Sequence, residues 1–231
     1  MNSIKQIEVL LADRLVGRLA LTKEGLCAFE YAPDWLGSGF SISPFELPLR
    51  SGVFIAKPRP FEGGFGVFDD CLPDGWGLLI LDRYLQQKGI NPRTLTLLDR
   101  LALVGSTGRG ALEFRPDNSV VTRQDFADFE KLALEAEKIL ASDDYMGEGI
   151  EEFQDRGGSP GGARPKIFVR YNDKEWLVKF RAKRDSQSIG VDEYRYSLLA
   201  KECGIEMPDT RLFEGKYFGV ERFDRTPQGK L

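Results

Sequence analysis

The chain has 231 residues, and 42% of them are hydrophobic, which is enough apolar material for one large domain or two small ones. Its formal net charge is −4 and its isoelectric point is near 5.2, so any nucleic-acid-binding surface has to be local. The sequence contains no histidine, which excludes a Ser-His-Asp triad, a Cys-His pair and a histidine-ligated metal within this chain.

Signals for membranes and disulfides are also missing from the sequence. A membrane-spanning helix needs about 18 to 20 uninterrupted apolar residues, and no window approaches that length. Charged residues interrupt the first 17 positions, where a signal peptide would be apolar. We therefore expect a cytoplasmic protein without a membrane partner. Cys27, Cys71 and Cys203 lie far apart and predict neither a disulfide framework nor a zinc site.

The first segment alternates apolar and polar residues as strands do. "IEVLLA" and "VGRLAL" are joined by Asp13 and Arg14, and "LCAFEY" follows Gly25, which predicts a small antiparallel meander. Residues 32–66 are rich in Pro, Gly and Ser and indicate ordered loops with short strands. A helix is expected after Pro73 and Asp74, ending at Gly89.

Two more helices and a strand follow. "TLTLLDRLALVG" predicts a helix that ends at Gly105, and "GALEFRP" predicts a strand. Residues 123–141 carry an apolar stripe at helical spacing with acidic residues opposite. Residues 142–155 are acidic and contain glycine, which makes them the best candidate for a boundary. We therefore predict two domains, residues 1–145 and residues 146–231.

The second domain begins with the glycine-rich stretch "RGGSPGGARPK", Arg156 to Lys166. After it come two predicted strands, a helix and two more strands, an order found in the small lobe of protein kinases. The segments are "PKIFVRY", "EWLVKFRA", "VDEYRYSLLAKECG", "DTRLFEG" and "KYFGVERFDR". The expected fold class is α+β: a β-rich N-terminal subdomain with helices, then a kinase-like small lobe with an antiparallel sheet plus a helix.

Lys179 is the first candidate site residue. A lysine inside an apolar strand is costly to bury unless it meets an anion, and kinases place a phosphate-binding lysine on the strand after a glycine-rich loop. Glu193, on the following helix, stands where kinases place the carboxylate that orients this lysine. The simpler alternatives stay open, namely that Lys179 faces solvent and that Glu193 is an exposed acid near a helix N-terminus.

The glycine-rich stretch has two interpretations as well. It matches neither the kinase G-x-G-x-x-G pattern nor the P-loop pattern, and on composition alone it is a plain linker. Its place before Lys179 and Glu193 instead favours a loop that faces phosphate groups.

Several ordered blocks give the chain a specific resemblance. It resembles the HipA family of serine/threonine kinase toxins over essentially all of its length. The blocks include "AFEYAPDWL", "FDDCLPDGW", "DRLALVGSTGRGALEF", "GGSPGGARPK", "WLVKF" and "VERFDR". The resemblance implies a serine/threonine protein kinase that binds ATP and Mg²⁺ when full length, with growth arrest and persistence as the outcome. We expect weak or absent binding of ATP and Mg²⁺ by this chain alone.

The resemblance also implies a set of site residues. Lys179 is implied as the phosphate-binding lysine and Glu193 as its helix partner. Ser159 matches the serine that the family autophosphorylates, and a phosphate there adds nearly two negative charges beside three cationic side chains of the stretch. The ATP-binding set that it implies is Ser159, Gly161, Gly162, Ala163, Lys166, Lys179, Glu221 and Phe223.

Partners follow from the resemblance in the same way. It implies a HipB-like DNA-binding antitoxin, contact with DNA only indirectly through that antitoxin, and glutamyl-tRNA synthetase as a possible protein substrate.

The chain ends at "RFDRTPQGKL", where relatives continue into a helical C-terminal lobe. That lobe carries the catalytic Asp and the Mg²⁺-binding Asn and Asp, so we expect no catalytic and no metal-binding residue in this chain and a catalytically incomplete fragment. The alternative is a non-catalytic module that binds an antitoxin or a separate kinase chain. Esterase or protease chemistry is disfavoured by the missing histidine.

Overall fold

The structure is a computed structural model that describes residues 3–119, 127–142, 144–157, 161–226 and 229–230. The chain forms two compact units. The first comprises Met1–Pro73, Asn91–Ser119 and Lys230, and the second comprises Asp74–Ile90, Val120–Gly229 and Leu231. The predicted α+β class with antiparallel sheets is confirmed.

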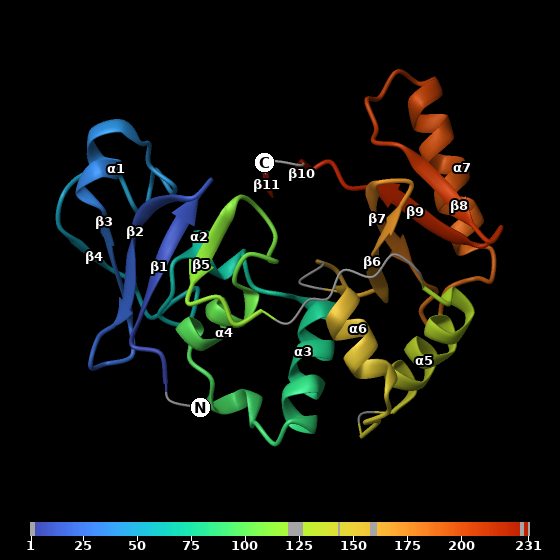
Figure 1. Cartoon of the computed structure of the whole chain (residues 1–231), viewed down its shortest axis with the longest axis horizontal. Coiled ribbons are helices and arrows are strands. Elements are labelled where there is room, and N and C mark those ends of the chain that lie inside the picture. The colour runs from blue at the N-terminus through green and yellow to red at the C-terminus, as the bar shows by residue number, and fades with distance from the viewer. Residues whose placement is uncertain (1–2, 120–126, 143, 158–160, 227–228, 231) are drawn as a thin grey trace. The chain divides into compact units, whose positions relative to one another are not determined.

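The first unit is built on a five-stranded antiparallel sheet in the order β4-β3-β2-β1-β5 (Figure 1). Strands β1, β2 and β3 form the predicted meander, and β5 adds to its free edge. The strands are β1 (Gln6–Leu11), β2 (Arg14–Leu21), β3 (Cys27–Tyr31), β4 (Val53–Ile55) and β5 (Leu112–Arg115). Helices of this unit are α1 (Pro33–Ser38), α2 (Gly66–Asp69) and α4 (Leu97–Val104), with a 3-10 turn at Pro92–Thr94.

The turn between β1 and β2 sets their register. Ala12 and Asp13 both have positive φ, 47° and 60°, as a two-residue hairpin turn requires when its twist matches that of the strands. The turn aligns Leu11 with Arg14, and a one-residue shift in register between Val9 and Leu10 then aligns Ile7 with Leu19. The side chains of Ile7 and Leu19 are both buried. One face of the sheet therefore joins the core of the first unit, where helix α4 packs against it.

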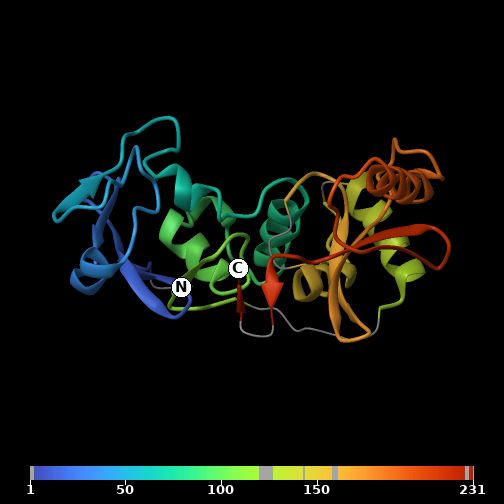
Figure 2. The same ribbon diagram turned by 90° about the horizontal axis from the view of Figure 1, so that it is seen from above.

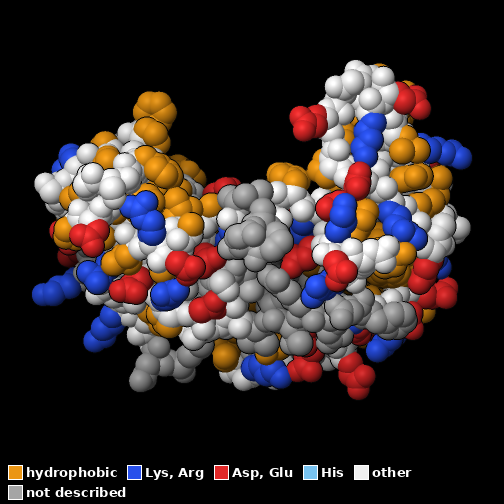
Figure 3. Space-filling view, turned by 45° about the horizontal axis from the view of Figure 1, so that its top comes forward, with side chains coloured by type: hydrophobic (Ala, Val, Ile, Leu, Met, Phe, Trp, Pro, Cys, Tyr) orange, Lys and Arg blue, Asp and Glu red, His pale blue; other side chains and the backbone are white. Residues whose placement is uncertain are grey.

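The surface of the first unit also carries apolar side chains. Figure 3 shows hydrophobic side chains, coloured orange, on the upper part of this unit. Phe45 is fully exposed, and Val53 and Ile55 of the edge strand β4 are more than half exposed. Exposed apolar side chains on a sheet edge are typical of a surface that meets another chain.

Helix α4 begins with a reciprocal cap. The Thr96 hydroxyl accepts from the Asp99 N–H at 3.2 Å, and the Asp99 carboxylate accepts from the Thr96 N–H at 2.9 Å. The same carboxylate also accepts from the Ile4 N–H at 2.9 Å, which ties the N-terminal segment to the helix. Burial disfavours the charge on Asp99, but these hydrogen bonds outweigh burial and hold the pKa of the carboxyl below its ordinary value.

The second unit contains a four-stranded antiparallel sheet in the order β6-β7-β9-β8. Its strands are β6 (Lys166–Tyr171), β7 (Lys174–Lys179), β8 (Thr210–Phe213) and β9 (Tyr217–Glu221), and helix α7 (Ile189–Glu202) connects β7 to β8. This is the predicted order of two strands, a helix and two strands. Two short strands follow near the end of the chain, β10 (Arg225–Thr226) and β11 (Gly229–Lys230).

Three helices supply the core against one face of this sheet. They are α3 (Gly75–Gln87), α5 (Phe129–Ala141) and α6 (Gly149–Gly157). Trp176, Val178 and Phe180 alternate along β7 and its extension and are buried in this core with side chains of the helices. Figures 1 and 2 show α3 (teal) and α7 (orange-red) at opposite ends of the second unit.

The segment in which the sequence analysis places a boundary contains helix α6. Ile150 and Phe153 of α6 are fully buried in the core of the second unit. Helix α5 begins at Phe129, because the Asp128 side chain accepts from the Lys131 N–H at 2.9 Å and caps it. The compact units do not follow the division at residues 145 and 146, and independent folding of those two parts stays a prediction.

No helix within the described ranges is both long and apolar enough to cross a membrane.

We predict that Asp99→Asn destabilises the protein by about 1 to 2 kcal/mol at neutral pH, because an amide makes poorer hydrogen bonds with the N–H groups of Thr96 and Ile4 than a carboxylate does. The folded-state pKa of Asp99 is lowered, so its contribution is present above the unfolded-state pKa, about 4, and is lost as pH falls through the folded-state pKa. Urea unfolding at pH 7 and at pH below about 3 measures the free energy of unfolding of the wild type and of Asp99→Asn. The difference between these two free energies should be smaller in acid. An equal difference at both pH values would contradict this role.

Candidate functional site

The candidate site lies on the face of the second unit's sheet that is opposite its core. Along β7, Glu175, Leu177 and Lys179 alternate with the buried side chains and are half-buried. Leu177 is aligned with Phe168 of β6 on one side and with Val220 of β9 on the other, and both are half-buried as well. Side chains aligned across antiparallel strands point to the same face, so an apolar row lies beside Lys179.

Lys179 forms an ion pair with Glu193 of helix α7. The Lys179 Nζ atom lies 2.9 Å from Glu193 Oε2, and the side chains are 32% and 20% exposed. The Lys179 Nζ atom also lies 5.2 Å from the centroid of the Phe218 ring. Helix α7 can approach the sheet because Gly190 has no side chain: a Cβ atom there would stand 2.1 Å from the Lys216 carbonyl oxygen. Glu193 follows Gly190 by about one helical turn and so reaches the lysine.

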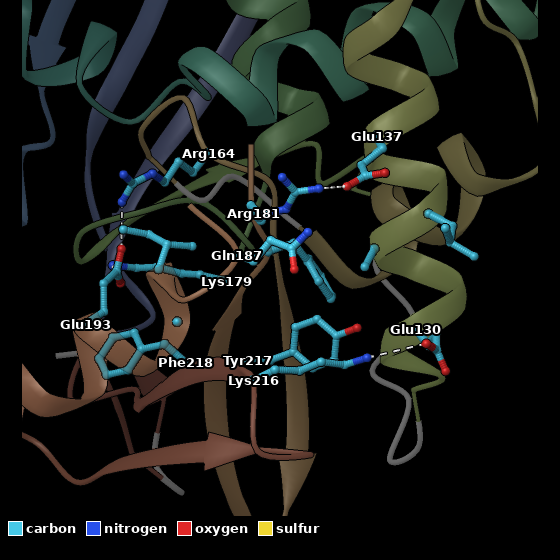
Figure 4. A pocket seen from close by; sticks show the side chains of 15 residues that line it. Glu130, Glu137, Arg164, Lys179, Arg181, Gln187, Glu193, Lys216, Tyr217 and Phe218 are labelled. Carbon is cyan, nitrogen blue, oxygen red and sulfur yellow. Dashed lines mark hydrogen bonds and ion pairs between the residues drawn. The ribbon is translucent and has the colours of Figure 1, made fainter. Parts of the chain in front are cut away.

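A second cation holds Glu193 from the other side. Arg164 Nη1 lies 2.7 Å from Glu193 Oε1, and Figure 4 shows Arg164 and Lys179 both directed toward Glu193. Arg164 also forms a two-point pair with Asp185, at 3.0 and 3.1 Å. The pKa of the Asp185 carboxyl lies below its ordinary value, first because the Ala182 N–H donates to it and then because Arg164 pairs with it. The network therefore presents two fixed cations around one carboxylate.

A cavity of about 250 Å³ adjoins this network between α5 and the start of α7 (Figure 4). Its walls are formed by Leu134 and Ala133 of α5 together with aromatic side chains of β9 and the ion pair of Lys179 and Glu193. Charged residues at its border are already paired, Arg181 with Glu137 and Lys216 with Glu130. The cavity thus gives access to the Lys179 pair from the side of α5.

The described part of the glycine-rich loop packs against its own strand and against helix α3. Lys166, the first residue of β6, is 4% exposed, and its Nζ donates to the carbonyl oxygens of Gly161 and Gly162. Gly162 has φ of +90°, which favours glycine. The Gly162 N–H donates to Asp74 Oδ1 at 2.7 Å. Residues 161–166 are therefore a packed loop with defined contacts.

Glu221 and Phe223 lie at the other end of the sheet. Glu221 is aligned with Trp176, three residues before Lys179, which places it about 10 Å along the strand from Lys179. Its side chain pairs with Lys174 at 2.7 Å, and its N–H donates to the Asp209 carbonyl oxygen at 2.8 Å. Phe223 is 75% exposed.

The structure brings Lys179 together with Glu193, and Lys166 together with Gly161, Gly162 and the neighbouring Ala163. It does not bring Glu221 and Phe223 to these groups. Ser159 lies outside the described residues. The binding role of every one of these residues stays a prediction.

Sequence reasoning missed several residues of the site. Arg164 and Asp185 are part of the Glu193 network, and the strand alternation could have identified Phe168, Leu177 and Val220. No local signal marks Asp74, because its contact with Gly162 spans 88 positions of the chain.

A metal site is not built from the described residues. Within the described ranges, no group of three or more Cys, Asp or Glu side chains is placed to hold a metal ion. The residues present fit a nucleotide better: a paired lysine, a glycine loop over a buried lysine, and an apolar row on the same face of the sheet.

Two family models match the chain. The model described as HipA N-terminal domain matches residues 7–115, and the model described as HipA-like C-terminal domain matches residues 158–231, which include Lys179 and Glu193. The chain is also similar to a serine/threonine-protein kinase toxin HipA from Shewanella oneidensis, with 25% identity over 238 aligned residues. The alignment covers 95% of this chain and 50% of that relative, so the chain spans about half the length of the curated relative.

We predict that the Lys179–Glu193 pair contributes little to stability. Because Lys179 is about one-third exposed, solvent screens the attraction, and a double-mutant cycle with Lys179→Ala and Glu193→Ala should give a coupling below about 1 kcal/mol in the free energy of unfolding. Chemical unfolding of the four proteins measures it. A coupling above about 2 kcal/mol would show that the pair serves mainly to hold α7 on the sheet.

Proposed function

This chain belongs to the HipA family, and we propose that its second unit is the ATP-binding small lobe of a serine/threonine kinase toxin. The observation that carries the proposal is the 2.9 Å ion pair between Lys179 of β7 and Glu193 of α7. In protein kinases a strand lysine binds the α- and β-phosphates and a helix carboxylate orients it. The activity of the whole protein, including that of any further lobe, is part of the proposal.

The apolar row beside Lys179 supports a place for the adenine. Phe168, Leu177 and Val220 offer a half-buried apolar surface on the lysine face. At one end of it, the guanidinium carbon of Arg222 lies 4.0 Å from the centroid of the Phe168 ring. Glu221 and Phe223 lie at the far end of the row, about 10 Å from Lys179 by strand geometry. This separation is comparable with the distance between the base and the phosphates of an extended nucleotide. We propose that the carbonyl oxygen of Glu221 and the backbone of Phe223 contact the edge of the base.

The glycine-rich loop would cover the phosphates. Gly161, Gly162 and Ala163 carry no bulky side chains, so a phosphate can approach this part of the loop closely. Lys179, held by Glu193, would supply the positive charge. Bound ATP with Mg²⁺ supplies the phosphoryl group for transfer to a protein hydroxyl, and the described residues orient the nucleotide for that transfer.

We propose regulation through Ser159. A phosphate on this serine would add negative charge next to Arg164 and Lys166 in the sequence, where it would compete with nucleotide phosphates. Autophosphorylation of Ser159 is taken from the family resemblance.

A HipB-like DNA-binding antitoxin is the proposed partner, and contact with DNA would be indirect. The exposed side chains of the first unit, which include Phe45 and Ile55, are a surface that such a protein partner can cover. Glutamyl-tRNA synthetase as the substrate and a cytoplasmic location stay predictions. A module that only binds partners, the second candidate, is favoured by the same exposed surface and requires no nucleotide.

Lys179→Ala should weaken Mg-ATP binding about 10- to 100-fold, because it removes a charged contact to the phosphates. Isothermal titration of this chain and of the full-length protein measures the change. Lys183→Ala is the matched control: it removes the same charge from an exposed lysine four residues along the chain and should leave the affinity unchanged.

Equal affinities for the wild-type protein and Lys179→Ala would contradict the proposal. Antitoxin binding should survive Lys179→Ala, and its loss together with a folding defect would assign Lys179 a structural role.

Phosphorylation of Ser159 can be tested directly. Tandem mass spectrometry of the full-length protein after incubation with Mg-ATP should find phosphate on the peptide that contains Ser159, and Ser159→Ala should abolish that signal. Phosphate only at other serines would contradict this part of the proposal.

A further inference from the structure

The start of helix α3 and the glycine-rich loop cap each other. Asp74 is the N-cap residue of α3, yet its side chain makes no hydrogen bond to the N–H groups of its own helix. It accepts instead from the Gly162 N–H, at 2.7 Å. In return, the Trp76 N–H of the first turn of α3 donates to the Gly162 carbonyl oxygen at 3.0 Å. The helix N–H that an N-cap side chain ordinarily satisfies is therefore satisfied by the loop.

Gly75 makes this contact possible. Its φ is +46°, and a Cβ atom on it would stand 2.8 Å from the Gly162 carbonyl carbon and oxygen and 2.9 Å from the Ala163 nitrogen. Real side chains do not approach a backbone so closely, so any other residue would push the loop away from the helix.

The helix side of the contact is rigid. Trp76 is 2% exposed, and its ring lies 5.0 Å from the ring of Phe153 in an edge-on arrangement. The loop is held from its other side by Lys166, whose Nζ donates to the carbonyl oxygens of Gly161 and Gly162. Gly162 is therefore held between the first turn of α3 and the buried Lys166, and both of its backbone polar groups are engaged.

We propose that Asp74 and Gly75 are positioning residues that set the conformation of the glycine-rich loop. This inference rests on the proposed function in one respect: the conformation of the loop matters for function only if the loop covers the phosphates of ATP. The Gly162 N–H is held by the Asp74 carboxylate and the Gly162 carbonyl oxygen by the Trp76 N–H, and the close approach at Gly75 adds to this. These contacts fix the position of Gly162 relative to Lys166 of β6, which is aligned with Lys179 of β7. Loss of the contact would release the loop from this conformation.

The test measures hydrogen exchange of the Gly162 amide by nuclear magnetic resonance in the nucleotide-free chain. Asp74→Ala removes the acceptor and should speed this exchange about five- to tenfold. Asp74→Asn keeps an oxygen acceptor without the charge and should remain within about twofold of the wild type. A role of Asp74 through its charge alone would make both variants behave alike and would overturn the inference.

Gly75→Ala should also speed exchange of the Gly162 amide, about tenfold or more, because the added Cβ atom displaces the loop. Gly89→Ala is the matched control, since Gly89 follows the other end of α3 with φ of +74° and its Cβ would meet nothing within 4 Å. Both variants place an alanine at a positive φ, which destabilises each of them through backbone strain. Gly89→Ala should nevertheless leave the exchange rate of the Gly162 amide unchanged. Equal exchange in the two variants would overturn the inference.

Mg-ATP titration of the same variants separates the inference from the proposed function. A drop in affinity of about fivefold or more for Asp74→Ala, restored in Asp74→Asn, supports both. Faster exchange with unchanged affinity would overturn the claim that the contact positions the loop for the nucleotide. A wild-type chain that binds no Mg-ATP, alone or within the full-length protein, counts against the proposed function, and the exchange rates then decide whether Asp74 and Gly75 hold the loop.

Discussion

The alternation of side chains along β7 is the constraint on which the second unit depends. Trp176 and Val178 must point into the core that α3, α5 and α6 complete. Because successive residues of a strand point to opposite faces, Leu177 and Lys179 are directed to the other face. Burial of one face therefore places the lysine where it meets Glu193, and the apolar row of Leu177 and its cross-strand neighbours lies beside it.

Two helices control two different parts of the proposed nucleotide site. Helix α7 carries the Glu193 carboxylate to Lys179, which it can do because Gly190 allows close packing on the sheet. Helix α3, at the opposite end of the second unit, holds the glycine-rich loop through Asp74. The charge that would meet the phosphates and the loop that would cover them are thus set by separate elements, and a change in one need not disturb the other.

The sequence predicted the elements of the site better than their contacts. The strand order follows from period-two alternation, and the pairing of Lys179 with Glu193 was expected from the similarity of that order to a kinase small lobe. Asp74 could not be found this way, because it has the pattern of an ordinary N-cap and its partner is 88 positions away. Helix α6 was missed because it has only nine residues, three of them acidic, and is too short to show a clear apolar stripe. Ile150 and Phe153 nevertheless anchor it in the core.

A crystal structure of this protein with Mg²⁺ and a non-hydrolysable ATP analogue would show whether the Lys179 face of the sheet binds nucleotide. We expect a phosphate oxygen within hydrogen-bonding distance of Lys179 Nζ, the base on the surface formed by Phe168, Leu177 and Val220, and the Lys179–Glu193 pair intact. An analogue bound away from Lys179, or a phosphate group on the buried face of the sheet, would contradict this expectation.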